Sequence, residues 1–122
     1  MASQIRQFQT ARGDLPVEEY LHSLRPKERA VTLRHVQLLS ELGRRLREPH
    51  VKRIVDQQRA LYELRPGGHR IFYCMREGET VVLLHAYRKK SNRTPARELA
   101  TAKRRYDRVM GGAGTAGFGG ER

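Results

Sequence analysis

Three short runs rich in aromatic and β-branched residues follow one another with no room for a helix between them. They span residues 60–65, 69–76 and 80–88 and read ALYELR, HRIFYCMR and TVVLLHAYR. The segments between them, PGG and EGE, have the length and composition of turns. Because strands joined by such short connections run antiparallel, the sequence predicts a three-stranded β-meander.

Helical signals flank this meander. Apolar residues recur at helical spacing after Pro16 and again after Pro26, so we expect two helices before the meander. A third helix is expected to begin with Thr94 as its cap and Pro95 in its first turn, and to end at Gly111.

Two weaker strand signals lie outside the meander. QIRQFQT at residues 4–10 is a weak candidate for a first strand, and residues 51–55 form a possible strand turn. The element order predicts an α+β domain: a small antiparallel sheet of the first strand and the meander, with two amino-terminal helices and one carboxy-terminal helix packed on one face. We expect one domain over residues 1–110. The segment 111–122 is glycine-rich with little to bury, which predicts a disordered tail.

The chain is strongly basic. Lys and Arg number 25 against 13 Asp and Glu, giving a formal net charge of +12. Such an excess favours a polyanionic partner such as RNA, DNA, a membrane surface or an acidic protein. The sequence shows neither a signal peptide nor an apolar run of membrane-spanning length, so we expect a cytosolic protein. The single cysteine, Cys74, and the lack of Cys/His clusters predict no disulfide, metal or other cofactor.

Strand alternation predicts which charged side chains share a face of the sheet. Glu63 and Arg65 point the same way in the first meander strand. A four-residue loop from Pro66 to His69 places Arg65 opposite Arg70. These three charged side chains should therefore meet at one end of the sheet.

The second turn sets the position of the last strand. A two-residue turn at 77–78 places Arg70 opposite His85. One face of the last strand is then formed by Val81, Leu83, His85 and Tyr87. With this register His85 and Tyr87 join the cluster, and Lys89 and Lys90 lie just beyond it. A one-residue slip would exchange the two faces.

The residue types in this cluster suit a phosphodiester. Cleavage of RNA without a metal needs a base for the 2′-hydroxyl proton, cations for the phosphorane and an acid for the leaving oxygen. The candidate cations are Arg65, Arg70, Lys89 and Lys90. The candidates for proton transfer are Glu63 and His85, with Tyr87 as a base-stacking group or weak acid. If Glu63 only pairs with an arginine and His85 is structural, plain polyanion binding remains, and this alternative stays open.

Two segments of the sequence also resemble a known family. LYELRPGGHRIFY and VVLLHAYRKKSNRTPARELATAKRR are similar to the HigB-like, phage-derived branch of the RelE/ParE toxin superfamily. The resemblance runs from about residue 5 to residue 110. It implies a RelE-like fold and a type II toxin that enters the ribosomal A site, cleaves translated mRNA and is held inactive by an antitoxin, often a helix-turn-helix protein.

The resemblance also implies roles for single residues. Arg70 matches the arginine that contacts the scissile phosphate, and the lysines at 89–90 match the basic end of the last strand. Glu98 falls near a tyrosine that matters in the RelE branch. The lysines that RelE carries on the first meander strand are absent, because Leu61 and Glu63 occupy those positions.

Further positive charge follows the last strand. We expect RNA contacts here from Tyr87, Arg88, Arg93 and Arg97, and the same surface would suit an acidic segment of the antitoxin. Two other functions remain open: a non-catalytic inhibitor of DNA gyrase of the ParE kind, and a plain nucleic-acid-binding module.

Overall fold

The computed structural model describes residues 3–119 of the chain. Its elements, in chain order, are β1 (Gln4–Phe8), α1 (Pro16–His22), α2 (Pro26–Leu42), the short 3₁₀ helix η1 (Gly43–Arg45), β2 (Val51–Arg53), β3 (Tyr62–Leu64), β4 (His69–Arg76), β5 (Thr80–Arg88), α3 (Ala96–Met110) and β6 (Thr115–Gly117). Helix α2 ends where Gly43 takes a positive φ of 53°, a conformation that favours glycine. None of the helices in residues 3–119 has the length and apolar character that a membrane span requires.

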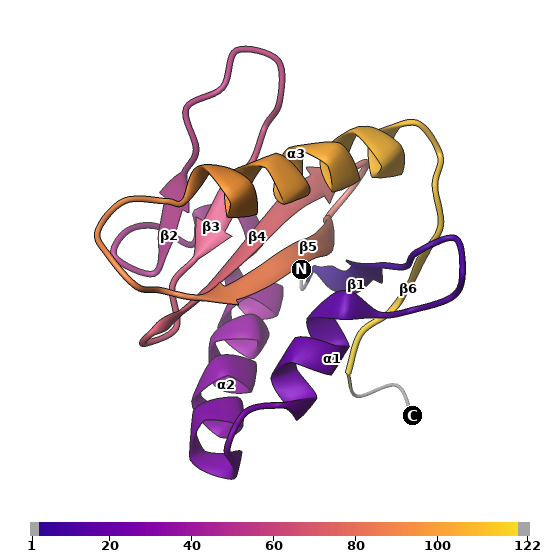
Figure 1. Ribbon diagram of the computed structural model, residues 1–122. Coiled ribbons are helices and arrows are strands. Elements are labelled where there is room, and N and C mark those ends of the chain that lie inside the picture. Colours follow the sequence, from indigo (N-terminus) through magenta and orange to yellow (C-terminus); the bar gives the residue numbers. More distant parts are fainter. Residues whose placement is uncertain (1–2, 120–122) are drawn as a thin grey trace.

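The strands form one six-stranded sheet in the order β2-β3-β4-β5-β1-β6. The predicted meander is present as β3, β4 and β5, and the weak first strand is β1. All neighbours are antiparallel except β1 and β5, which run parallel because the chain crosses from β1 through both amino-terminal helices before it enters the meander (Figure 1). The α+β class is therefore confirmed, with a sheet that is larger than expected and partly parallel.

The helices lie on both faces of the sheet, and the expectation that they share one face is wrong (Figure 1). Helices α1 and α2 cover one face, where Val17, Leu21 and Leu39 pack against β4 and β5. Helix α3 covers the other face through Ala102 and Val109. Helix α3 needs a face of its own because the first two helices already fill the opposite one.

A β-bulge in β5 determines which side chains face α3. Beside the hairpin turn Arg76 pairs with Thr80, whereas beyond the irregularity at residues 72–73 Phe72 pairs with His85. Leu84 is the extra residue of β5 and has no partner in β4. The bulge moves His85 to the α3 face, whereas Val81 and Leu83 face α1 and α2.

The predicted pairings of the meander have different outcomes. The register of β3 with β4 is confirmed, since the pairing of Leu64 with Ile71 is the one that sets Arg65 opposite Arg70. The predicted pairing of Arg70 with His85 is wrong, because Arg70 lies opposite Tyr87. The prediction that Val81, Leu83, His85 and Tyr87 share one face is also wrong. The bulge places His85 and Tyr87 on the α3 face, opposite Val81 and Leu83.

The carboxy-terminal segment was expected to be disordered, and this is wrong for residues 115–118. Strand β6 pairs antiparallel with β1. The side chain of Arg6 donates from Nε to Oγ1 of Thr115 over 2.8 Å. Phe118 is 8 % exposed and joins the core under α1 and α2. A buried aromatic ring, backbone pairing and the Arg6–Thr115 hydrogen bond together hold this glycine-rich segment on the sheet. The last part of the predicted tail, residues 120–122, lies outside the described residues.

Candidate functional site

A small polar pocket lies where β3 and β5 end and β4 begins, next to the loop that leads to α3. Its volume is about 220 Å³. We call it the strand-end pocket, and it is lined by Glu63, Arg65, Arg70, Tyr87, Lys89, Ser91, Asn92, Arg93 and Thr94. Five of the predicted site residues therefore line one pocket together with Arg93, which was predicted as an RNA contact.

Glu63 forms the buried acidic part of the strand-end pocket. Its side chain is 1 % exposed. Its Oε2 accepts a hydrogen bond of 2.9 Å from the Tyr87 hydroxyl, and its Oε1 lies 3.4 Å from Nε of Arg65. Burial, followed by the charge of Glu63, raises the pKa of Tyr87 well above its usual value. Tyr87 therefore stays protonated at neutral pH and acts as a hydrogen-bond donor to the carboxylate.

The guanidinium of Arg70 is fixed by the turn between β3 and β4. Its Nη1 donates to the carbonyl oxygens of Gly67 and His69, over 2.9 and 2.8 Å. The His69 ring is held in turn, since Nδ1 lies 2.6 Å from the Tyr20 hydroxyl and Nε2 lies 2.8 Å from Oε1 of Glu28. Tyr20 of α1 and Glu28 of α2 thus hold His69, and the carbonyl of His69 in turn positions Arg70, whose side chain lies on the opposite face of the sheet.

The loop between β5 and α3 closes the pocket. Helix α3 begins at Ala96 with Pro95 as its cap residue and no side-chain cap bond, so the expected capping by Thr94 is wrong. The Thr94 side chain instead hydrogen-bonds Tyr87. Sequence reasoning missed Thr94, Ser91 and Asn92 as lining residues. A run of small polar residues between a strand and a helix start was the available signal.

His85 lies beside the strand-end pocket and does not line it. Its ring stacks on Phe72 and Tyr87 beneath α3. Its Nε2 lies 2.6 Å from Oε1 of Glu98, and its Nδ1 lies 3.3 Å from Nη1 of Arg105. Because a guanidinium only donates, Nδ1 accepts and Nε2 carries the proton. Burial is the main cause that lowers the pKa of His85, so the neutral ring has both nitrogens engaged.

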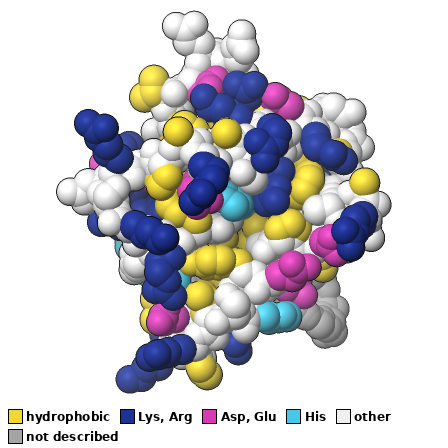
Figure 2. Space-filling model, viewed as in Figure 1, with side chains coloured by type: hydrophobic (Ala, Val, Ile, Leu, Met, Phe, Trp, Pro, Cys, Tyr) yellow, Lys and Arg dark blue, Asp and Glu magenta, His cyan; other side chains and the backbone are white. Residues whose placement is uncertain are grey.

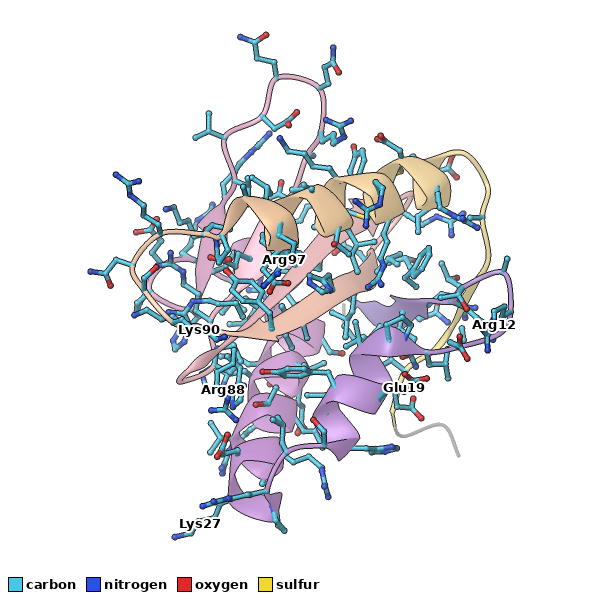
Figure 3. All side chains as sticks on the ribbon, viewed as in Figure 1. Arg12, Glu19, Lys27, Arg88, Lys90 and Arg97 are labelled. Carbon is cyan, nitrogen blue, oxygen red and sulfur yellow. The ribbon has the colours of Figure 1, made fainter. Side chains whose placement is uncertain are left out.

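The other predicted residues lie around the pocket. Arg88 points to the α1/α2 side, where its Nη2 lies 3.2 Å from Oε1 of Glu28. Lys90 and Arg97 are exposed, at the end of β5 and at the start of α3 (Figure 3). Figure 2 shows that Lys and Arg side chains cover this face widely, with Asp and Glu in small separate groups. The structure thus separates a pocket from a surrounding basic surface.

The described residues contain no group of three or more His, Cys, Asp or Glu side chains placed to hold a metal ion. Cys74 is a free thiol buried between α3 and the sheet. Burial raises the pKa of this thiol to about 12, which keeps it protonated.

The fold is similar to that of two solved structures. The crystal structure of the toxin–antitoxin complex RelBE2 from Mycobacterium tuberculosis matches with a TM-score of 0.54 at 23 % identity, covering 73 % of this chain and 100 % of that one. The archaeal RelE–RelB complex from Pyrococcus horikoshii OT3 matches with a TM-score of 0.57 at 20 % identity, covering 77 % and 100 %. The RelE-like fold expected from the sequence is therefore confirmed.

The sequence itself matches a family model. Residues 19–107 match the family described as Phage derived protein Gp49-like (DUF891), which covers most of the chain. This chain belongs to that family, which confirms the expected phage-derived branch. No curated protein sequence matches the chain.

Proposed function

We propose that this chain is the toxin of a type II toxin–antitoxin pair and inhibits growth as an endoribonuclease that cleaves translated mRNA on the ribosome. The structural neighbours are a toxin–antitoxin complex and a RelE–RelB complex, which supports an antitoxin as the partner. The observation that carries the enzymatic part is the strand-end pocket, where four cationic side chains surround one buried carboxylate.

The pocket supplies the groups that cleavage requires. Glu63 takes the proton of the 2′-hydroxyl, and O2′ attacks the phosphorus. Arg70 and Arg93 stabilise the charge on the non-bridging oxygens, because guanidinium groups stay charged and bind them bidentately. The P–O5′ bond breaks, and the ammonium of Lys89 protonates the departing oxygen. The products are a 2′,3′-cyclic phosphate and a 5′-hydroxyl.

The remaining residues hold this arrangement. Tyr87 and Arg65 donate to the two oxygens of Glu63, which fixes the orientation of the carboxylate. His85 orients α3 through Glu98, and thus positions the loop that carries Arg93. Lys90 and Arg97 bind the RNA backbone around the pocket.

The test is growth arrest on induction, combined with primer extension on cellular mRNA. We expect the native chain to stop growth and to produce cuts in translated messages. Arg70→Ala should abolish both while the circular dichroism spectrum stays native. Arg12→Ala, at an exposed side chain far from Lys90 in Figure 3, is the matched control and should leave both intact. Unchanged arrest by Arg70→Ala would remove Arg70 from the mechanism.

One observation favours a second candidate function. The engagement of both ring nitrogens of His85 removes one of the two predicted proton-transfer groups from the pocket. A non-catalytic inhibitor of DNA gyrase of the ParE kind needs no such group. It predicts DNA double-strand breaks with intact mRNA on induction, so the same cultures distinguish the two functions.

A further inference from the structure

A second hollow lies on the opposite face of β3 from the strand-end pocket. It has a volume of about 440 Å³. We call it the tyrosine pocket. Its floor contains Tyr62 and Tyr73, whose rings stack with centroids 5.4 Å apart. It opens beside β2, which is the outermost strand of the sheet on that side.

The tyrosine pocket has an apolar floor and a basic rim. Leu46, Val51 and Met75 complete the floor, and all three are buried or partly buried. The rim carries three exposed arginines and one glutamate: Arg44, Arg47, Arg53 and Glu48. An apolar centre with a charged border is the anatomy of a protein-binding site.

The rim arginines have no acidic partner within residues 3–119. Arg47 donates from Nη1 to the carbonyl of Arg44, and the guanidinium of Arg53 lies over the Tyr62 ring at 5.5 Å. None of the three forms an ion pair in the described part of the chain, whereas Arg59 and Arg88 elsewhere do. Exposed unpaired arginines beside an apolar floor are complementary to carboxylates that flank an apolar side chain.

The ring geometry distinguishes a protein from a nucleic acid as the occupant. Single-stranded RNA binds through bases that stack on free aromatic faces. The two faces of Tyr62 are covered by Tyr73 on one side and by the Arg53 guanidinium on the other. Tyr73 is only 3 % exposed. Neither ring offers a face to a base, whereas an aliphatic or aromatic anchor residue needs only the apolar hollow.

We propose that the tyrosine pocket docks an acidic segment of a partner protein, with one apolar side chain in the hollow and carboxylates on Arg44, Arg47 and Arg53. The identification of this partner as the antitoxin rests on the function proposed above. The proposed contacts of the pocket with an acidic segment do not depend on that function. Because Tyr62 and Glu63 point to opposite faces of β3, this site anchors the partner without covering the strand-end pocket.

The test is fluorescence anisotropy of the full chain with a short labelled peptide of alternating glutamate and leucine. Arg44→Glu combined with Arg53→Glu should weaken binding of this peptide by roughly tenfold or more, because two attractive charges become repulsive. Arg25→Glu combined with Arg34→Glu, two exposed arginines of the α2 region, makes the same change in net charge and should alter it less than about twofold.

Three outcomes would overturn the proposal. The first is that the native chain does not bind the peptide, and the second is that both double variants weaken peptide binding equally. The third outcome is that Arg44→Glu with Arg53→Glu weakens binding of a labelled oligouridine RNA and leaves binding of the peptide unchanged.

A growth assay distinguishes failure of the docking site from failure of the proposed function. The double variant Arg44→Glu and Arg53→Glu should still arrest growth, since it leaves the strand-end pocket intact. Loss of peptide binding with retained arrest supports the docking site. If the native chain does not arrest growth, the proposed function fails while the binding result stands.

Discussion

The carboxylate of Glu63 lies at the bottom of the strand-end pocket, with donors from Tyr87 and Arg65 directed at its two oxygens. Strand alternation with the length of the β3–β4 loop was sufficient to predict that Glu63, Arg65 and Arg70 share one end of one face. It did not predict the state of His85, because the partner of that ring is Glu98 on α3, and the position of α3 over the sheet is a tertiary property. The chemical role of a strand residue therefore depends on groups from other elements that strand alternation does not place.

Removal of the Tyr87 hydroxyl tests how much its hydrogen bond to the buried Glu63 carboxylate stabilises the fold. We expect Tyr87→Phe to lower the free energy of unfolding by about 1–3 kcal/mol, because the buried carboxylate loses one of its two donors. Urea denaturation measures this change. Tyr106→Phe is the matched control, since the Tyr106 hydroxyl only accepts from the Ala60 amide at a more exposed position, and it should have a smaller effect. Equal effects would contradict the proposed dependence.

The lowered pKa of His85 predicts a pH dependence of stability. A histidine with a folded pKa below its unfolded value of about 6.5 binds protons more readily in the unfolded chain, so stability is full above that pH and falls as the pH decreases through it. We expect the native chain to lose more stability than His85→Gln between about pH 7 and pH 5. The carboxylates with lowered pKa, such as Asp56, act at more acidic pH. Parallel stability curves for both chains would contradict this.

At the scale of elements, the two hairpins of the meander show what a sequence can and cannot determine. The loop at residues 66–68 predicted the register of β3 and β4 correctly. Between β4 and β5 the loop has three residues with Gly78 at a φ of 71°, and Leu84 adds a bulge. Each difference shifts the pairing by one residue. Together they move Arg70 by two positions, from His85 to Tyr87, which leaves Arg70 on the predicted face.

Strand β6 was not predicted, because its segment is rich in glycine. The contribution of Phe118 to holding this strand can be tested. We expect Phe118→Ala to lower the free energy of unfolding by about 3 kcal/mol, because it removes a buried ring from the core under α1 and α2. Thermal and urea denaturation measure this. Val55→Ala, at a side chain that is 95 % exposed, is the control and should change nothing measurable. A Phe118→Ala variant as stable as the native chain would show that β6 does not contribute to the core.

At the scale of the whole molecule, the basic side chains that give the net charge of +12 have two different roles. Two basic side chains, Arg59 with Asp107 and Lys103 with Asp56, form ion pairs that hold the β2–β3 loop onto α3. Composition predicted a polyanionic partner, but it did not distinguish these paired cations from those around the two pockets that form no ion pair within residues 3–119, such as Lys89, Arg93 and Arg44. That distinction requires the positions of the acidic residues in space.

The salt dependence of RNA binding should identify the cations that contact phosphate. The logarithm of the association constant falls linearly with the logarithm of salt concentration, with a slope of about 0.7 per phosphate contact on a single strand. We expect Lys89→Gln combined with Arg93→Gln to reduce this slope by about 1.4 in titrations with single-stranded RNA. Arg12→Gln combined with Arg34→Gln, two exposed arginines that do not line the strand-end pocket, should leave it unchanged. Equal slopes for the two double variants would remove Lys89 and Arg93 from the RNA interface.

The extra residue at Leu84 has a consequence for comparing this chain with others. A relative whose β5 lacks the bulge must be aligned with a one-residue gap inside the strand. A gapless alignment through that strand would shift His85 and the lysines after it by one position, and would transfer functional assignments onto side chains that point to the wrong face.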